Sequence, residues 1–203
     1  MRRSRRKELI LYDSTGKRTV WLKDHFKGIG GFLVCGGPSL ANYDLAELQR
    51  PSVISMGVNN AAAYAWTTHF TCADPVGKFD GDVILDARVT KIIPIRKMTN
   101  HVCVKRGGVF KRTGFLVKDC PNVFSFMDQS KGDPFNCEDF LTFPRPLWGY
   151  RTEDEAKRHG RRKFLAAMFY GVRLMHYLGF ARVYMLGVDF KMTADNSYAW
   201  EGR

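Results

Sequence analysis

The chain has 203 residues, 45% of them apolar and 26% charged, and a formal net charge of +12. This length fits one domain with a full hydrophobic core, because domains usually contain about 100 to 200 residues. Its apolar runs are far shorter than the roughly 20 residues of a membrane-spanning helix, and the start, MRRSRRKELILYD, lacks the apolar centre of a secretion signal. The sequence thus argues against a membrane span and predicts a soluble, cytoplasmic protein.

The N-terminal part, residues 1–29, is predicted to be a basic tail with one short amphipathic stretch, Val20–Phe26. The folded domain, residues 30–203, is expected to begin at the glycine pair Gly30 and Gly31. Removal of the tail is therefore expected to leave the core intact.

A strand, a glycine turn and a helix are predicted next. Phe32–Cys35 is a short apolar run of the kind that a buried parallel strand needs, and Gly36 and Gly37 let the backbone turn and approach a ligand. Pro38 suits the first position of a helix, where the amides that follow and the Ser39 hydroxyl would point at a phosphate. The turn is neither a dinucleotide fingerprint nor a Walker A loop, and an ordinary strand-to-helix connection is the alternative.

Further apolar runs predict strands whose carboxyl ends carry polar residues. Asn59 and Asn60 follow one such run, Asp74 another, and Asp189 the last. Ligands of parallel sheets bind outside the carboxyl ends of the strands, so these side chains are candidates for a nucleotide site. An asparagine pair is also typical of a turn, and the sequence leaves open which of the two faces a ligand. The predicted strands are Val53–Val58, His69–Ala73, Lys91–Ile95, Asn122–Phe126 and Arg182–Leu186.

Helices are predicted between these strands. A short helix is expected over Leu40–Leu48 and another in the alanine-rich segment after Asn60, whereas residues 128–151 read as a long loop. Near the C-terminus an apolar stripe predicts a core helix that ends at Gly179. The stripe consists of Phe164, Met168, Gly171, Met175 and Leu178, with Arg162, Arg173 and His176 nearer the other face. These elements together predict a single Rossmann-like α/β domain with a mostly parallel sheet and helices on both faces.

Charge and cysteines bound the choice of ligand. Basic residues gather in the clusters 2–7, 96–118 and 157–163, but no helix-turn-helix, zinc-finger or RNA-recognition signature accompanies them, nor do aromatic residues that look exposed. Sequence-specific nucleic-acid binding is not expected; a solvated face, or a field that attracts an anionic nucleotide or acceptor, explains the charge. Five scattered cysteines without a C-x-x-C pair predict a reducing compartment and no metal site.

The motifs LVCGGPSL, VNN, LMHYLGFARVYMLGVDF and SYAW resemble the bacterial family 42 sialyltransferases and their relatives over Gly31 to Trp200. The resemblance implies a metal-independent transferase that moves a sugar from a cytidine monophosphate donor to a hydroxyl acceptor with inversion. It places the glycine-proline-serine turn, and either Asn59 or Asn60, on the donor nucleotide. It also implies that Tyr198 bonds the departing phosphate, with Lys191 where the family has a second tyrosine.

The family's general base is a histidine that lies beyond the tyrosine-alanine-aromatic motif, and no residue before Arg203 matches it. Truncation of a longer protein is the favoured explanation. His101, His159 and His176 are weaker substitutes.

Two alternatives stay open. The glycine-proline-serine-leucine turn is also similar to that of archaeal-type 6-hydroxymethylpterin pyrophosphokinases, in which case Asp74 and Asp189 would hold magnesium for transfer from ATP. A nucleotide-binding or polyanion-binding domain without catalysis is the third interpretation, because a fold does not fix an activity.

Overall fold

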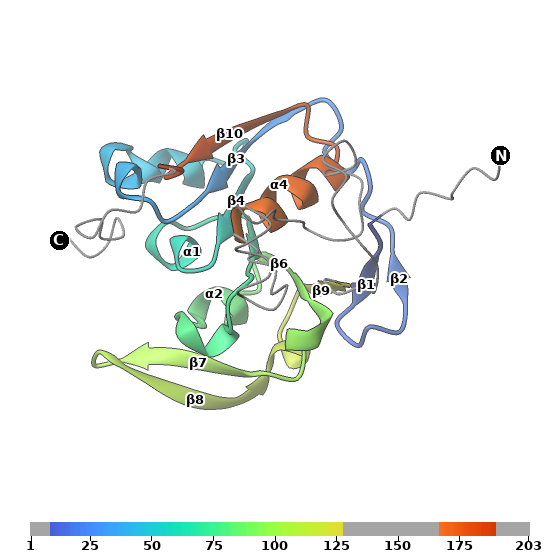
Figure 1. The fold of residues 1–203 in the computed structure, drawn as a ribbon, viewed down its shortest axis with the longest axis vertical. Coiled ribbons are helices and arrows are strands. Elements are labelled where there is room, and N and C mark those ends of the chain that lie inside the picture. Colours follow the sequence, from blue (N-terminus) through green and yellow to red (C-terminus); the bar gives the residue numbers. More distant parts are fainter. Residues whose placement is uncertain (1–8, 128–166, 190–203) are drawn as a thin grey trace, which may run out of the picture.

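The computed structural model describes residues 9–127 and 167–189, and shows an α/β protein built on a mixed, mostly parallel sheet of eight strands (Figure 1). The strands of this sheet are β1 (Leu11–Asp13), β2 (Thr19–Val20), β3 (Gly30–Val34), β4 (Ser55–Val58), β5 (His69–Thr71), β6 (Thr90–Pro94), β9 (Val123–Phe126) and β10 (Arg182–Leu186). The α-helices are α1 (Ala61–Tyr64), α2 (Asp82–Leu85) and α4 (Ala167–Tyr177), and short 3-10 segments span Pro38–Asn42, Leu45–Gln49, Val76–Lys78, Ile95–Lys97 and Val117–Asp119.

The strand order is β10-β3-β4-β5-β6-β9-β1-β2. The first six strands in this order run parallel, and β1 and β2 pair antiparallel at the far edge. Central parallel strands are covered on both faces, which is why continuous apolar runs mark them in the sequence. The predicted mostly parallel sheet is confirmed, and each predicted strand is present within two residues of its expected bounds.

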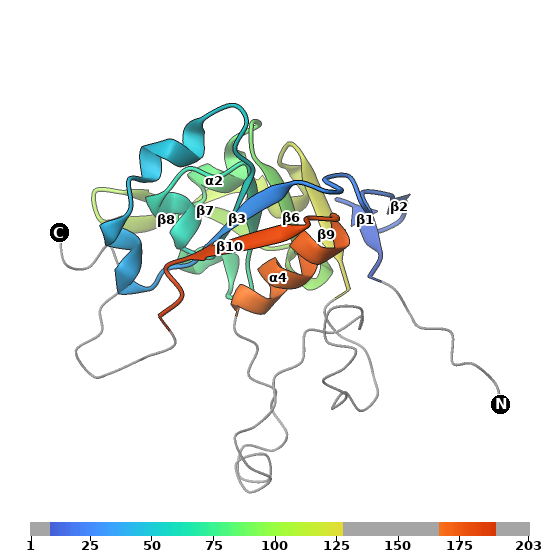
Figure 2. The ribbon, with the colours of Figure 1, turned by 90° about the horizontal axis from the view of Figure 1, so that it is seen from above.

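One face of the sheet packs against α4. Leu33 of β3 and Met56 and Val58 of β4 form a buried cluster with Leu174 and Met175 of the helix. Figure 2 shows α4 lying along β10 and β3 on this side. Gly171, Met175 and Leu178 of the predicted apolar stripe are buried, as expected.

Arg173 on the same helix differs from the expectation that it lies on an outer, polar face. It is only 3% exposed, and removal from water lowers its pKa to about 10. Its Nε and Nη2 have no hydrogen-bond partner within the described residues.

The opposite face is covered by short elements. Val34 packs with Leu40 and Ala61, and farther along the sheet Phe70 and Ile93 belong to a second cluster that includes residues of α2. The single helix expected over Leu40–Leu48 is instead two 3-10 segments. Tyr43 between them is extended, and the Asp44 side chain accepts a hydrogen bond from the Ala46 amide (3.1 Å), so the chain restarts a turn there.

The described residues therefore do not show the regular helices that the sequence predicts on both faces of the sheet. Among the described residues, an α-helix longer than four residues covers only the α4 face of the sheet.

The N-terminal part of the chain belongs to the core, contrary to the predicted boundary at Gly30. Leu11 of β1 has no exposed surface and pairs with Phe126 of β9. The Ser125 hydroxyl donates to the Asp13 carbonyl (3.0 Å). Three residues are too few to show a period, and their partner strand lies more than 100 residues away, so no local pattern predicts β1.

A separate hairpin, β7 (His101–Arg106) with β8 (Val109–Leu116), follows β6 and projects from the body (Figure 1). Gly107 and Gly108 both have positive φ, +58° and +81°, as the tight turn of a two-residue hairpin requires. The sequence analysis assigned no element to this segment.

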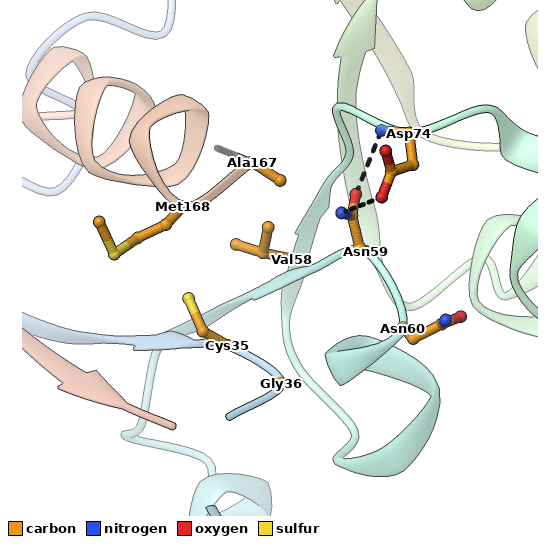
Figure 3. Close-up of a pocket in the computed structure, with 8 residues that line it drawn as sticks. All are labelled: Cys35, Gly36, Val58, Asn59, Asn60, Asp74, Ala167 and Met168. Atoms are coloured by element: carbon orange, nitrogen blue, oxygen red, sulfur yellow. Dashed lines mark hydrogen bonds between the residues drawn. The ribbon is translucent and has the colours of Figure 1, made fainter. Parts of the chain in front are cut away.

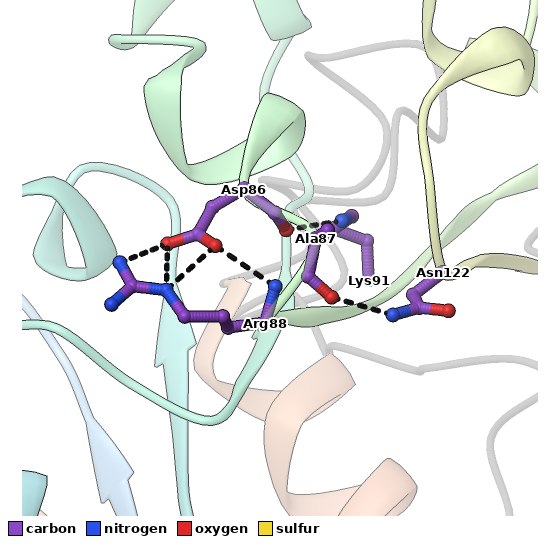
Figure 4. Close-up of polar contacts among 5 residues, drawn as sticks. All are labelled: Asp86, Ala87, Arg88, Lys91 and Asn122. Atoms are coloured by element: carbon purple, nitrogen blue, oxygen red, sulfur yellow. Dashed lines mark hydrogen bonds and ion pairs between the residues drawn. The ribbon is translucent and has the colours of Figure 1, made fainter.

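The amino ends of β6 and β9 are held by polar contacts to the loop after α2 (Figure 4). The Asp86 carboxylate accepts from the backbone amide and the guanidinium of Arg88, which lowers the pKa of Asp86. The Lys91 ammonium donates to the Asp86 carbonyl (2.8 Å), and the Asn122 side chain donates to the Ala87 carbonyl (2.6 Å). Each of these polar groups therefore has at least one hydrogen-bond partner at this edge of the sheet.

Within the described ranges, no helix combines the length and the apolar character that crossing a bilayer demands.

Candidate functional site

The strand order reverses at β3. From β3 the chain builds the sheet in one direction through β4, β5, β6 and β9, and β10 then pairs with the other side of β3. The connections on the two sides also cover opposite faces, because α4 leads into β10 and the short elements join β3 to β6. In open α/β sheets ligands bind at the carboxyl ends of the strands where the order reverses.

A cavity of about 160 Å³ lies at this edge of the sheet. One wall is apolar and the other is polar (Figure 3). Its lining residues come from the ends of β3, β4 and β5 and from α4: Cys35, Gly36, Val58, Asn59, Asn60, Asp74, Ala167 and Met168. The structure thus brings four of the predicted site residues, Gly36, Asn59, Asn60 and Asp74, to one cavity.

Asn59 uses its side chain to hold the loop after β5. Its Oδ1 accepts from the Ala73 amide (3.0 Å), and its Nδ2 donates to Asp74 Oδ2 (2.9 Å) (Figure 3). Its backbone amide donates to the Thr71 carbonyl, and its φ is +52°, a left-handed conformation that asparagine tolerates better than most residues. Asn59 is therefore a positioning residue for Asp74.

Asn60 is the asparagine whose side-chain amide is available to a ligand. It precedes α1 without capping it, and its side chain makes no hydrogen bond to another described residue. Together with the second carboxylate oxygen of Asp74, it supplies a donor and acceptors for a polar ligand group. Of the two asparagines that the sequence left open, Asn60 is therefore the better candidate for contact with a ligand.

Lys97 is a residue that the sequence analysis placed at a strand end without giving it a role. It is 2% exposed, and its ammonium donates to the carbonyls of Ala73 and Asp74. A buried cation therefore lies under the loop that carries Asp74. The sequence signal was a lysine three residues after the end of an apolar strand, which by itself is indistinguishable from a solvated one.

The predicted phosphate loop is occupied by the chain itself. Asp189 Oδ2 accepts a hydrogen bond from the Ser39 amide (3.1 Å), and the Gly37 amide donates to the Gly187 carbonyl (2.8 Å). The Leu40 amide donates to the Gly37 carbonyl as the first bond of the 3-10 segment that Pro38 opens. The expectation that the amides of Ser39 and Leu40 are free for an anion is therefore corrected.

Gly37 is needed for space. Its φ of −66° is open to any residue, but a Cβ atom there would lie 2.0 Å from Asp189 Oδ2 and 2.6 Å from the Gly187 carbonyl. The glycine lets the loops after β3 and β10 touch, which places Asp189 against the Ser39 amide.

Among the described residues that line the cavity, Asp74 is the one carboxylate, and no histidine is present. Burial raises the pKa of the Cys35 thiol to about 12, so it stays protonated at neutral pH. His101 lies in β7 and His176 in α4, and neither lines the cavity. His159, Lys191 and Tyr198 lie outside the described residues.

Among the described residues, no group of three His, Cys, Asp or Glu side chains could hold a metal ion. Comparison with known proteins does not assign this chain to a family. No family model, curated protein or solved structure matches this chain. The site must therefore be interpreted from its own geometry.

Proposed function

We propose that this protein is a glycosyltransferase-like enzyme with a Rossmann-like arrangement, which binds a nucleotide-sugar donor of the CMP-sialic-acid type and transfers the sugar to a hydroxyl acceptor. The observation that carries the proposal is the cavity at the reversal of strand order, which Asn60 and Asp74 line together with apolar residues. The resemblance of the GGPSL, LGVDF and SYAW motifs to family 42 sialyltransferases gives the donor class.

The two walls suit a nucleotide sugar. A carboxylate and an amide hydrogen-bond to ring hydroxyls, and Val58 and Met168 can pack on the apolar face of a ring. Because the cavity is smaller than the roughly 300 to 1,000 Å³ of typical small-molecule sites, it would take one ring of the donor.

The phosphate would bind at the loop Gly36–Ser39. Its oxygen would replace Asp189 Oδ2 as the acceptor of the Ser39 amide, because one N–H cannot serve two anions equally well. Donor binding is thus proposed to release the Asp189 carboxylate from the loop.

In the transfer step, the acceptor oxygen would bond to the anomeric carbon on one face while the bond to the phosphate breaks on the other, which inverts the configuration. Lys191 and Tyr198 are proposed to donate hydrogen bonds to the departing phosphate. The acceptor proton would pass to the Asp74 carboxylate, the one candidate for a general base among the described lining residues.

Two carboxylates near the loop, Asp74 in the cavity and Asp189 at Ser39, favour a second candidate function. A pair of this kind could hold magnesium with ATP for a pyrophosphokinase reaction.

Calorimetric titration with cytidine monophosphate and with ATP, each with and without magnesium, separates the candidates. We expect cytidine monophosphate to bind without metal. Asn60→Ala should weaken that binding by about 0.5 to 1.5 kcal/mol, the net value of one hydrogen bond. Asn42→Ala, an exposed asparagine of the neighbouring 3-10 segment, is the matched control and should bind normally.

Magnesium-dependent binding of ATP alone would replace the transferase by the pyrophosphokinase. Absence of binding in every titration would contradict both candidate functions. Equal affinities of the Asn60→Ala and Asn42→Ala variants for cytidine monophosphate would contradict the assigned site.

A further inference from the structure

We propose that the β7–β8 hairpin, residues 101–116, is a binding element for single-stranded nucleic acid without sequence preference. This inference is independent of the cavity and of the proposed transferase function. It rests on the charge, the exposed aromatic rings and the shape of the hairpin.

The hairpin is strongly cationic. Residues 101–116 contain Lys105, Arg106, Lys111 and Arg112 and not one Asp or Glu, and all four cations are exposed. Arg106 reaches Asp82 of α2 (3.2 Å) in an ion pair that is more than half exposed and therefore weak. Lys111 and Arg112 form no ion pair with any described residue.

Aromatic rings lie exposed among these cations, which the sequence analysis did not expect. Phe110 is 42% exposed and Phe115 is 56% exposed. The Lys105 ammonium lies over the Phe110 ring, 6.0 Å from its centre. Sites that bind single strands combine two components: exposed aromatic rings, on which bases stack, and cations, which neutralise the phosphates.

Protection of a sheet edge explains only part of this pattern. The β7 edge is bonded to the body, since the Gly81 amide donates to the Cys103 carbonyl (2.7 Å). β8 is the outer strand of the hairpin, and charges there would prevent pairing with another chain. Val109, Phe110 and Phe115 work against that purpose, because exposed apolar side chains favour association.

The distribution along β8 favours an extended polyanion over a lipid surface. A membrane-binding hairpin would gather its apolar side chains at one end. Here Phe110 lies next to the turn and Phe115 near the other end of the strand, beyond the irregular register that separates the pairs Cys103–Arg112 and His101–Leu116. Arg112, two residues along β8, and Lys105, the cross-strand partner of Phe110, share a face of the hairpin with the Phe110 ring, so a base stacked on that ring would have its phosphates beside these cations.

The test is fluorescence anisotropy of the full chain with a labelled oligothymidine of about 20 nucleotides, titrated between about 50 and 200 mM salt. Lys105→Ser/Arg112→Ser, which removes the two cations on the Phe110 face, should weaken binding and reduce the slope of log K against log salt by about 1.4, because each phosphate contact contributes about 0.7. Phe110→Ser should weaken binding by roughly fivefold or more and leave the slope unchanged.

The matched control is Lys17→Ser/Arg18→Ser, which removes two exposed charges from the β1–β2 turn. It should retain the affinity and the slope of the native chain. Equal weakening by both double variants would show attraction by net charge alone and would overturn the proposal. Binding to phosphatidylserine vesicles without binding to the oligonucleotide would overturn it in favour of a membrane surface. Circular dichroism checks that each variant is folded.

Discussion

Asn59 and Asn60 are adjacent in the chain and have different tasks. The left-handed backbone of Asn59 turns its amide towards the loop after β5, where both ends of the amide are bonded. Asn60 then precedes α1 and lines the cavity. Loss of the Asn59 amide would therefore move Asp74, whereas loss of the Asn60 amide would remove a contact.

His69 is the residue from which we predict a pH dependence of stability. Burial lowers its pKa to about 4, with a smaller contribution from His25, and the Phe26 ring lies edge-on against it. Between about pH 6.5 and pH 4 the unfolded chain binds a proton that the folded chain does not. Stability should therefore be fully present above pH 6.5 and fall by up to about 3 kcal/mol as the pH drops to 4.

Urea unfolding across this range measures the effect. His69→Gln should flatten the dependence, and His176→Gln, at an exposed position of α4, should leave it as it is in the native chain. The same pH dependence in His69→Gln and in the native chain would exclude His69 as the source.

At the scale of elements, β1 shows how a strand of three residues can be part of the core. Its Leu11 is fully buried against β9, and its Asp13 carbonyl accepts the Ser125 hydroxyl. A chain that starts at Ser14 should therefore lose at least about 2 kcal/mol of unfolding free energy relative to one that starts at Leu9. Chemical denaturation of the two chains measures the difference.

Equal stability of these two chains would mean that β1 contributes nothing to the core. That result would restore the simple basic tail that the sequence suggested. The comparison with the chain from Leu9 isolates β1 from the basic residues before it.

At the scale of the whole molecule, the close packing of α4 on the sheet shapes the cavity, because Ala167 and Met168 form part of its wall. Gly171 permits this packing. A Cβ atom there would lie 2.4 Å from Leu33 Cδ1 and 3.2 Å from Val58 Cγ2. The helix could accept an alanine only by moving away from β3 and β4.

Gly171→Ala should therefore lower stability by about 1 to 3 kcal/mol through overpacking, partly offset by about 1 kcal/mol of helix propensity. Thermal unfolding measures the net loss. His176→Ala, at an exposed position of the same helix, tests propensity without the packing change. A Gly171→Ala variant that is as stable as the native chain would show that helix and sheet separate without cost.

The sequence by itself determined the fold class, the central strands and the edge at which polar residues gather. Apolar runs such as those of β3 and β6 report burial directly, and the residue after each run lies at the carboxyl edge. The same local signals placed Asn60 and Asp74 at this edge, and both line the cavity.

Only the tertiary structure decided which of these residues face the cavity and which hold one another. The Asp189 carboxylate meets the Ser39 amide because β10 returns to β3 across 150 positions of the chain, a contact to which no local period corresponds. Burial of Lys97 and exposure of Phe110 likewise depend on which distant elements cover them. Sequence patterns record what each segment can bury, and the packing of distant segments determines what is buried and what is left for a ligand.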